Sequence, residues 1–87
     1  MTNKTELMLL LKYDSPVVKL NDCLDELGLA KVDANRRASE NLLPVPTFRM
    51  RESQKSPRLI HVEDLAAYID EQHEAAQKTW LAINARR

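Results

Sequence analysis

Four prolines and one glycine divide this chain of 87 residues into short pieces. Proline lacks a backbone amide donor and restricts the residue before it, so helices and central strands are expected to begin or end near these positions. Glycine readily takes the left-handed backbone conformation that often ends a helix. The five residues are Pro16, Pro44, Pro46, Pro57 and Gly28. The length predicts one domain, residues 1–87, in which these breaks separate the elements.

Leucines at helical spacing predict a helix near the start of the chain, over residues 3–13. They are Leu7, Leu10 and Leu11. Because the apolar run that contains them is continuous, a buried strand is the alternative interpretation. The turn at Pro16 ends this element, and residues 17–20 predict a short extended piece.

Two helices joined by a tight turn are predicted next. Apolar residues at helical spacing place the first at about residues 22–27. Asn21 is its expected N-cap, and Gly28 is expected in the left-handed conformation at its end. The second runs from about Lys31 to Glu40, and Asn41 is expected in the left-handed position after it. A helix, a tight turn and a second, basic helix form a helix-turn-helix.

The second of these helices combines a thin apolar stripe with a basic exposed side. The stripe consists of Val32 or Ala34, followed by Ala38 and Leu42. The exposed side carries Lys31, Asn35, Arg36, Arg37 and Ser39. We expect the stripe to lie on the core and the basic side to face solvent.

Two strands joined by a polar loop follow. In residues 47–51 the side chains alternate, with Phe48 and Met50 on one face and polar residues on the other. Residues 52–57 predict a loop, and residues 58–62 predict a second short strand. Two strands joined by a basic loop form a hairpin of the kind called a wing.

A long amphipathic helix is predicted from near Glu63 to about Asn84. Acidic residues in its first turn suit the positive end of the helix. Its first half can close the core, but its second half has little left to contact in so small a domain. Three apolar residues there predict an interface with a second copy of the chain. They are Trp80, Leu81 and Ile83.

Basic charge is concentrated in the middle third of the chain, although the whole chain has a net charge of zero. Residues 31–58 contain seven Lys or Arg and three Asp or Glu, a net of +4, whereas the segments on either side are each −2. A localised basic segment indicates an anion-binding face. The alternative is a chance excess of a few charges.

Few residues point to catalysis or to a metal site. His61 and His73 have no Ser or Cys partner arranged as a nucleophile, and one glycine cannot build a phosphate-binding loop. Cys23 is the only cysteine and is expected to be a small buried residue. We therefore expect no enzyme, cofactor, metal or small-molecule substrate.

The chain also has no apolar run of the length that a membrane helix needs. The N-terminal residues lack the pattern of a secretory signal. We therefore expect a cytoplasmic protein without a membrane partner.

The basic helix and the basic hairpin together predict binding of double-stranded DNA. Arginine can donate two bonds to guanine and asparagine can pair with adenine, so the helix suits the major groove. The hairpin suits phosphates or the minor groove. Taken alone, the arginines of the helix would be better explained as an ordinary solvated face. The predicted DNA-binding residues are Lys31, Asn35, Arg36, Arg37, Ser39, Arg49, Arg51, Ser53, Gln54, Lys55 and Arg58.

The order of elements predicts a mainly helical α+β fold, a winged helix-turn-helix with a two-stranded wing and a long C-terminal helix. Three segments carry a resemblance to a known family: residues 42–49, residues 53–59 and residues 61–66. They resemble the pyocin activator family, small bacterial and phage regulators related in outline to excisionase-type winged helices. Residues 31–41 share less with that family.

The resemblance implies a transcriptional activator of bacteriocin or prophage genes that binds promoter DNA at the bacterial nucleoid. Its expected partners are DNA, a second copy of the chain and the transcription machinery. Two alternatives stay open. One is an excisionase-like factor that bends DNA. The other is a protein-interaction module that docks through the C-terminal helix. The zero net charge and the apolar end of that helix, with Trp80, Leu81 and Ile83, favour it.

Overall fold

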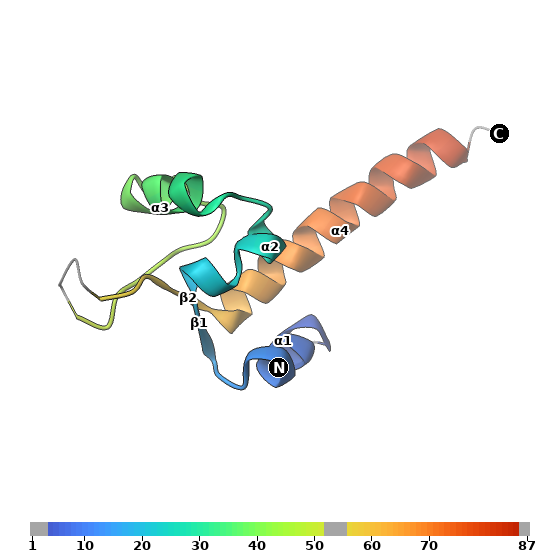
Figure 1. The fold of residues 1–87 in the computed structure, drawn as a ribbon. Coiled ribbons are helices and arrows are strands. Elements are labelled where there is room, and N and C mark those ends of the chain that lie inside the picture. Colours follow the sequence, from blue (N-terminus) through green and yellow to red (C-terminus); the bar gives the residue numbers. More distant parts are fainter. Residues whose placement is uncertain (1–3, 52–55, 86–87) are drawn as a thin grey trace.

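Four α-helices and two short strands make up the described part of the chain, residues 4–51 and 56–85, in this computed structural model (Figure 1). The helical elements are α1 (Lys4–Tyr13), the 3-10 turn η1 (Leu20–Asp22), α2 (Leu24–Leu27), α3 (Lys31–Ser39) and α4 (Val62–Asn84). The strands β1 (Val17–Lys19) and β2 (Leu59–His61) form an antiparallel sheet. The mainly helical α+β fold class and the long C-terminal helix are confirmed.

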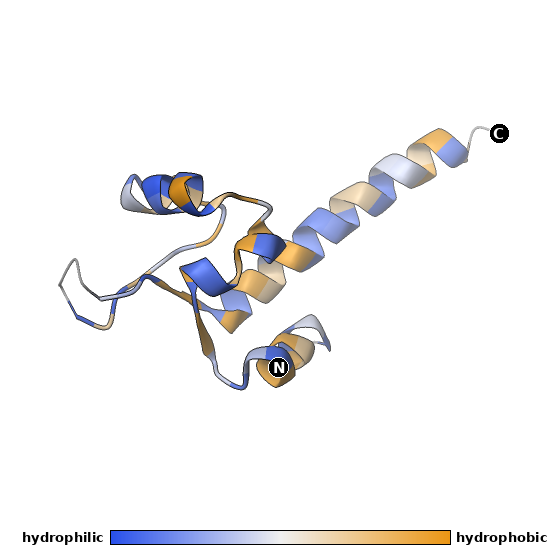
Figure 2. Ribbon diagram, viewed as in Figure 1, coloured by the Kyte–Doolittle hydropathy of each residue, from blue (hydrophilic) through white to orange (hydrophobic). Residues whose placement is uncertain are grey.

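The core gathers where the sheet meets the first turns of α4. Val18 of β1 pairs with Ile60 of β2, and both side chains are buried. Val62 and Leu65 of α4 are fully buried beside them. Figure 2 shows this concentration of hydrophobic residues on the strands and the start of α4. The remaining buried residues come from α1, η1, α2, α3 and the segment after α3: Leu9, Leu20, Cys23, Leu27, Ala34, Ala38, Val45 and Ala66.

The predicted helix at the start of the chain is confirmed as α1, but its buried face differs from the predicted one. Leu9 is buried, whereas Leu7 is 50% exposed and Leu11 is 69% exposed. Thr5 Oγ1 donates to Asp70 Oδ1 of α4 at 2.5 Å, which fixes the face that α1 turns toward α4. Residues 7–11 are all apolar and consecutive, so apolar side chains occupy every side of the helix. Their spacing therefore could not predict which side is buried.

A polar cluster joins α1 to α2. Tyr13 Oη donates to Glu26 Oε1 at 2.6 Å, and the Lys12 ammonium bonds to the same oxygen. Burial, assisted by this hydrogen bond, raises the pKa of Tyr13 to about 12. Burial alone would raise the pKa of Glu26, but the hydrogen bonds from Lys12 and Tyr13 outweigh it and lower that pKa. The cluster therefore holds α1 beside α2 with a charged carboxylate.

The first helix of the predicted pair is divided into η1 and α2. Leu20 and Cys23 are both buried, and a tight turn with Cys23 N bonded to Leu20 O at 3.2 Å brings them to one side. The predicted N-cap role of Asn21 is therefore wrong. Cys23 occupies the position before α2 and makes no side-chain cap. The Asn21 side chain instead accepts a hydrogen bond from Asn35.

Both predicted left-handed residues are confirmed. Gly28 has φ +69° and Asn41 has φ +56°. Leu29 N bonds to Leu24 O at 3.2 Å, and Leu42 N bonds to Arg37 O at 2.8 Å. These backbone bonds end α2 and α3 in the same way, by satisfying carbonyls that the last helical turn leaves open.

The predicted hairpin is only partly formed. The strand expected over residues 47–51 is reduced to one antiparallel bridge, between Phe48 and Leu59. The second predicted strand is confirmed as β2, but it pairs with β1. The physical reason is burial: Ile60 packs in the core opposite Val18, whereas Met50 is 77% exposed and gives the other strand no buried face. The sheet of this protein is therefore not the predicted wing.

The long C-terminal helix is confirmed within one residue at its start. Residues 71–83 are exposed, and Figure 1 shows this half of α4 projecting from the rest of the molecule. Trp80, Leu81 and Ile83 are each more than half exposed. No described helix is long and apolar enough to cross a membrane.

His61 caps the start of α4. Its Nδ1 accepts a hydrogen bond from Glu63 N at 3.1 Å, which satisfies one of the open amides of the first turn. We expect His61→Ala to lower the free energy of unfolding by about 1 kcal/mol, whereas His61→Asn retains a side-chain acceptor and loses less. Urea denaturation measures both. Equal losses in the two variants would show that the cap does not contribute.

Candidate nucleic-acid interface

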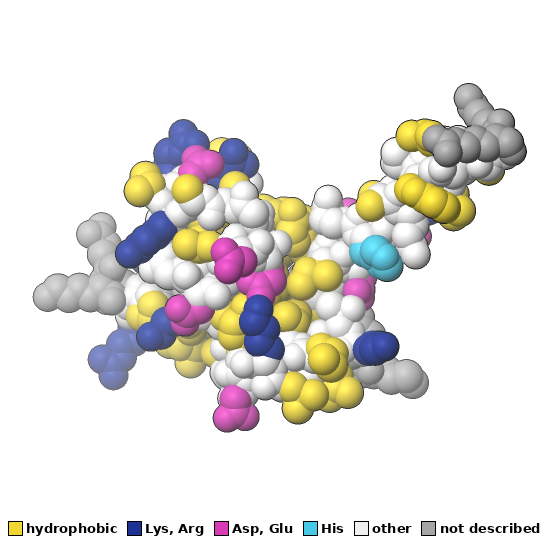
Figure 3. All heavy atoms as spheres, turned by 45° about the vertical axis from the view of Figure 1, so that its right-hand side comes forward, with side chains coloured by type: hydrophobic (Ala, Val, Ile, Leu, Met, Phe, Trp, Pro, Cys, Tyr) yellow, Lys and Arg dark blue, Asp and Glu magenta, His cyan; other side chains and the backbone are white. Residues whose placement is uncertain are grey.

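Small side chains set α3 close to the core and turn its polar side outward. Ala34 and Ala38 are buried, whereas Val32 is 83% exposed and Leu42 is 62% exposed. Of the two predicted stripes, the one through Ala34 therefore packs as far as Ala38, and the predicted burial of Leu42 is wrong because the chain turns away after Asn41 takes the left-handed conformation. Figure 3 shows basic side chains gathered with acidic ones at the end of the molecule that carries α3.

One carboxylate pairs with both arginines of α3. Arg36 Nη2 donates to Asp33 Oδ1 at 2.5 Å, and Arg37 Nε lies 3.4 Å from Asp33 Oδ2. The hydrogen bond from Arg36 lowers the pKa of Asp33, and that of Arg36 is raised in return. Asp33 was not among the predicted site residues, although its spacing of three and four residues from the arginines is typical of ion pairs along a helix.

Two of the other predicted side chains of α3, Asn35 and Ser39, are bonded within the protein, whereas Lys31 is exposed. Asn35 Nδ2 donates to Asn21 Oδ1 at 2.9 Å and to Lys31 O at 2.8 Å. Ser39 Oγ donates to Arg36 O at 2.6 Å. Because both amide donors of Asn35 are used, a two-bond contact with adenine would require one of these bonds to break.

The hairpin segment brings further arginines to the same end of the molecule. The bridge between Phe48 and Leu59 sets residues 48–51 beside Arg58, and Figure 1 shows this segment and α3 opposite the projecting end of α4. Arg51 is exposed, whereas Arg49 and Arg58 are partly buried. The Arg49 Nε atom is buried without a hydrogen bond among the described residues. The predicted contacts Ser53, Gln54 and Lys55 lie outside the described residues.

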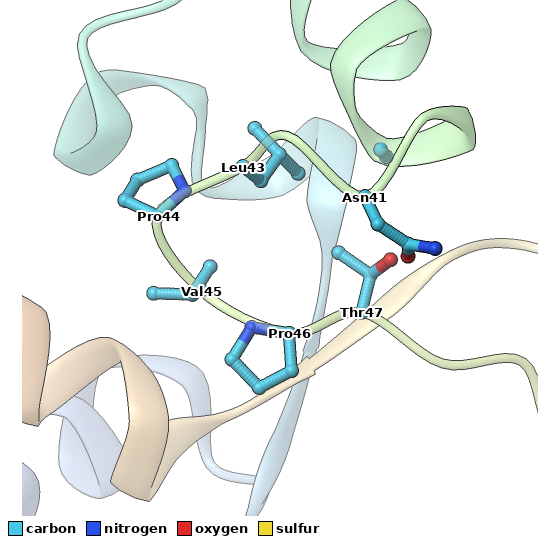
Figure 4. Close-up of a pocket in the computed structure, with 7 residues that line it drawn as sticks. Asn41, Leu43, Pro44, Val45, Pro46 and Thr47 are labelled. Atoms are coloured by element: carbon cyan, nitrogen blue, oxygen red, sulfur yellow. The ribbon is translucent and has the colours of Figure 1, made fainter.

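A pocket of about 310 Å³ lies between the end of α3 and the segment that follows it (Figure 4). Residues 41–47 curve around it, with Asn41 and Thr47 side by side at one edge. Val45, between two prolines, is buried. Two prolines and a buried valine restrict the backbone here, so the position of the hairpin relative to α3 is held by this segment. The pocket is a result of tertiary packing. In the sequence, only the two prolines that flank Val45 indicated an unusual backbone here.

The described residues hold no cluster of three or more His, Cys, Asp or Glu side chains that could bind a metal ion. Cys23 is fully buried, as predicted, and burial raises the pKa of its thiol to about 11. A thiol in this state is a poor nucleophile.

These features define a small, mainly helical α+β protein with arginines from α3 and from the hairpin segment at one end. The chain belongs to the pyocin activator protein PrtN family, whose family model matches residues 5–76. The resemblance described above is thereby confirmed. The family is one of transcriptional activators without enzymatic activity, and such a role implies binding to DNA in general.

The match begins in α1 and ends before Trp80, so the outer end of α4 lies beyond it. None of the curated proteins matches the chain, and none of the solved structures does.

Proposed function

We propose that this chain is a sequence-specific, DNA-binding transcriptional activator of bacteriocin or prophage genes. In this proposal residues 1–87 form one winged helix-turn-helix domain in the cytoplasm, and the bridged segment around Phe48 and Leu59 is a minimal wing. The observation that carries the proposal is the shared location of α3 and of the segment bridged to β2, both of which contain arginines, in a member of an activator family.

In the complex, α3 lies in the major groove of promoter DNA. Arg36 and Arg37 are the base-reading residues, because a guanidinium group can donate two bonds to guanine. Both are close to Asp33, but their side chains are 63% and 43% exposed and can turn toward a groove. Four further basic residues contact phosphates or the minor groove. They are Arg49, Arg51, Lys55 and Arg58.

The bound form is a homodimer that uses Trp80, Leu81 and Ile83, and it contacts the transcription machinery while on DNA. Helix-turn-helix dimers bind two half-sites about one helical turn apart.

Selection of bound duplexes from a random pool tests the proposal. We expect an enriched motif with related half-sites, and binding to it that weakens steeply as salt is raised. A pool that stays unenriched at low salt would contradict the proposal.

A DNA-bending, excisionase-like role is the second candidate, favoured by the exposed apolar side chain of Met50 next to Phe48. Exposed apolar side chains that face the minor groove can insert between base steps and kink the duplex. A circular-permutation assay on the selected site separates the two roles. A large bend that Met50→Ala removes would favour the architectural factor.

Asp33 is expected to limit the affinity of α3 for DNA in general. Asp33→Ala removes the carboxylate that both guanidinium groups now contact and the only acidic charge described on α3. We expect tighter binding to unrelated duplexes, a steeper salt dependence and a smaller ratio of specific to non-specific affinity. Fluorescence anisotropy on a selected site and on a scrambled one measures all three. Lys78→Ala, at the opposite end, serves as a control. A lower affinity for both duplexes would show that Asp33 supports binding instead.

A further inference from the structure

Two surfaces distant from α3 expose large apolar side chains. The first, the α1 patch, consists of Leu7, Met8 and Leu11, which are 50%, 57% and 69% exposed. The second, the α4 ridge, consists of Trp80, Leu81 and Ile83, which are 62%, 56% and 61% exposed. Figure 3 shows hydrophobic side chains both at the lower part of the molecule and along the projecting end of α4. Neither surface takes part in the core.

The α1 patch adjoins a groove of about 380 Å³. The residues that line the groove are Lys4, Thr5, Met8, Leu9 and Lys12. Its apolar lining comes from Met8 and Leu9, and two lysines stand on α1 one turn to either side of Met8. The groove shares Met8 with the α1 patch, so the patch adjoins a hollow that can receive a bulky apolar side chain.

The α4 ridge continues the stripe by which α4 packs on its own core. That stripe includes Val62, Leu65 and Ile69. Farther along α4, Trp80 and Ile83 lie on the same side of the helix, because they follow Ile69 at whole numbers of helical turns. The stripe is buried at Val62 and Leu65 and uncovered at Trp80 and Ile83. Since α4 has no proline or glycine, it cannot turn the ridge back onto its own α1. Among the described residues of one copy, none covers the ridge.

We propose that two copies of this chain form a reciprocal dimer, in which the α4 ridge of each copy packs on the α1 patch of the other. This deepens the homodimer within the proposed function by assigning the surface that receives the ridge. It does not depend on binding to DNA.

The area that a stable dimer buries favours this arrangement over a pairing of the two ridges alone. Each of the six exposed side chains offers roughly 100 Å². Two ridges packed on each other would cover on the order of 600 Å², less than specific interfaces bury. A reciprocal dimer covers both surfaces of both copies, on the order of 1,200 Å², which reaches the range of stable interfaces.

The charges beside the two surfaces are opposite in sign. Lys4 and Lys12 line the groove of the α1 patch. The exposed turns of α4 before the ridge carry Glu71 and Glu74. Lys12 already pairs with Glu26, and Glu74 with Lys78, within the chain, so Lys4 and Glu71 are the charges left for a contact between copies. Charges of this kind guide two copies into the reciprocal orientation and disfavour contact between like surfaces.

Mixing two variants tests reciprocity. Leu11→Lys alters the α1 patch and Leu81→Glu alters the α4 ridge, both at exposed positions that leave the core intact. In sedimentation runs without DNA, we expect each variant alone to dimerise at least about tenfold more weakly than the wild-type chain, because both of its contacts are altered. In an equimolar mixture one contact is unaltered and the other joins lysine to glutamate, so native mass spectrometry is expected to detect a heterodimer.

Leu42→Lys is the matched control, because the same change falls on a 62% exposed leucine outside both surfaces. It is expected to dimerise like the wild-type chain. Three results would each overturn the proposal: a wild-type monomer at all concentrations, wild-type dimerisation of Leu11→Lys, or a mixture without heterodimer. A dimer that binds no DNA would instead refute the proposed function and leave the reciprocal interface standing.

Discussion

Replacing Arg36 and Arg37 together with alanine is expected to remove specific DNA binding while leaving the fold intact. Neither side chain belongs to the core, since their exposed fractions are 63% and 43%. A bidentate contact with a base contributes about 1–3 kcal/mol, so losing two costs on the order of 2–6 kcal/mol. The loss should also lower the salt dependence, because two positive charges leave the interface.

Titrations of the selected duplex at several salt concentrations measure the affinity and the salt slope together. Lys78→Ala is the control: it removes a positive charge from α4, where Lys78 pairs with Glu74 at 3.3 Å. If the double arginine variant retains both affinity and slope, α3 is not the reading helix. A changed slope with unchanged sequence preference would limit the two arginines to phosphate contacts.

The second large effect concerns stability. Ile60 is fully buried in β2, opposite Val18 and in the same core as Leu65. Truncating such a side chain removes apolar contacts and leaves a cavity, so Ile60→Ala is expected to cost about 2–5 kcal/mol of unfolding free energy. The free energy of unfolding of a small domain is about 5–15 kcal/mol in total, so a loss of this size greatly raises the fraction of unfolded molecules.

Ile83→Ala provides the matched control, because the same side chain is 61% exposed on the α4 ridge. Guanidinium denaturation at protein concentrations low enough to keep the chain monomeric should show a loss within about 0.5 kcal/mol for this variant. Similar losses in the two variants would contradict the placement of the core. At high concentration Ile83→Ala is expected to lose stability as well, since the dimer interface then contributes.

The two pairs of variants separate folding from recognition. The arginine pair acts at the end of the molecule that carries α3, and the isoleucine pair compares the core with the projecting helix. Because these sites share no partner, their effects on stability should add. A non-additive result would show that the exposed side of α3 is coupled to the core, into which Ala34 and Ala38 of the same helix are packed.

Local interactions made several features of this protein predictable from the sequence. Gly28 and Asn41 end their helices because left-handed conformations suit these residues, whatever packs around them. The long helix α4 follows from apolar spacing along one continuous stretch, and its exposed outer half follows from the small size of the domain. The family resemblance was likewise carried by short segments.

Only the tertiary structure decided which surfaces meet. The five consecutive apolar residues of α1 do not favour one side of the helix. The burial of Leu9 and the hydrogen bond from Thr5 to Asp70 define the side that faces α4. The strand β2 had two candidate partners, and burial of Ile60 opposite Val18 selected β1 over the residues around Phe48. The sequence by itself thus determined where α2 and α3 end and where α4 begins, because caps and periodicity act over a few residues, but it placed the start of α2 wrongly. Strand partners and buried faces depend on contacts between distant segments, and those exist only once the chain has folded.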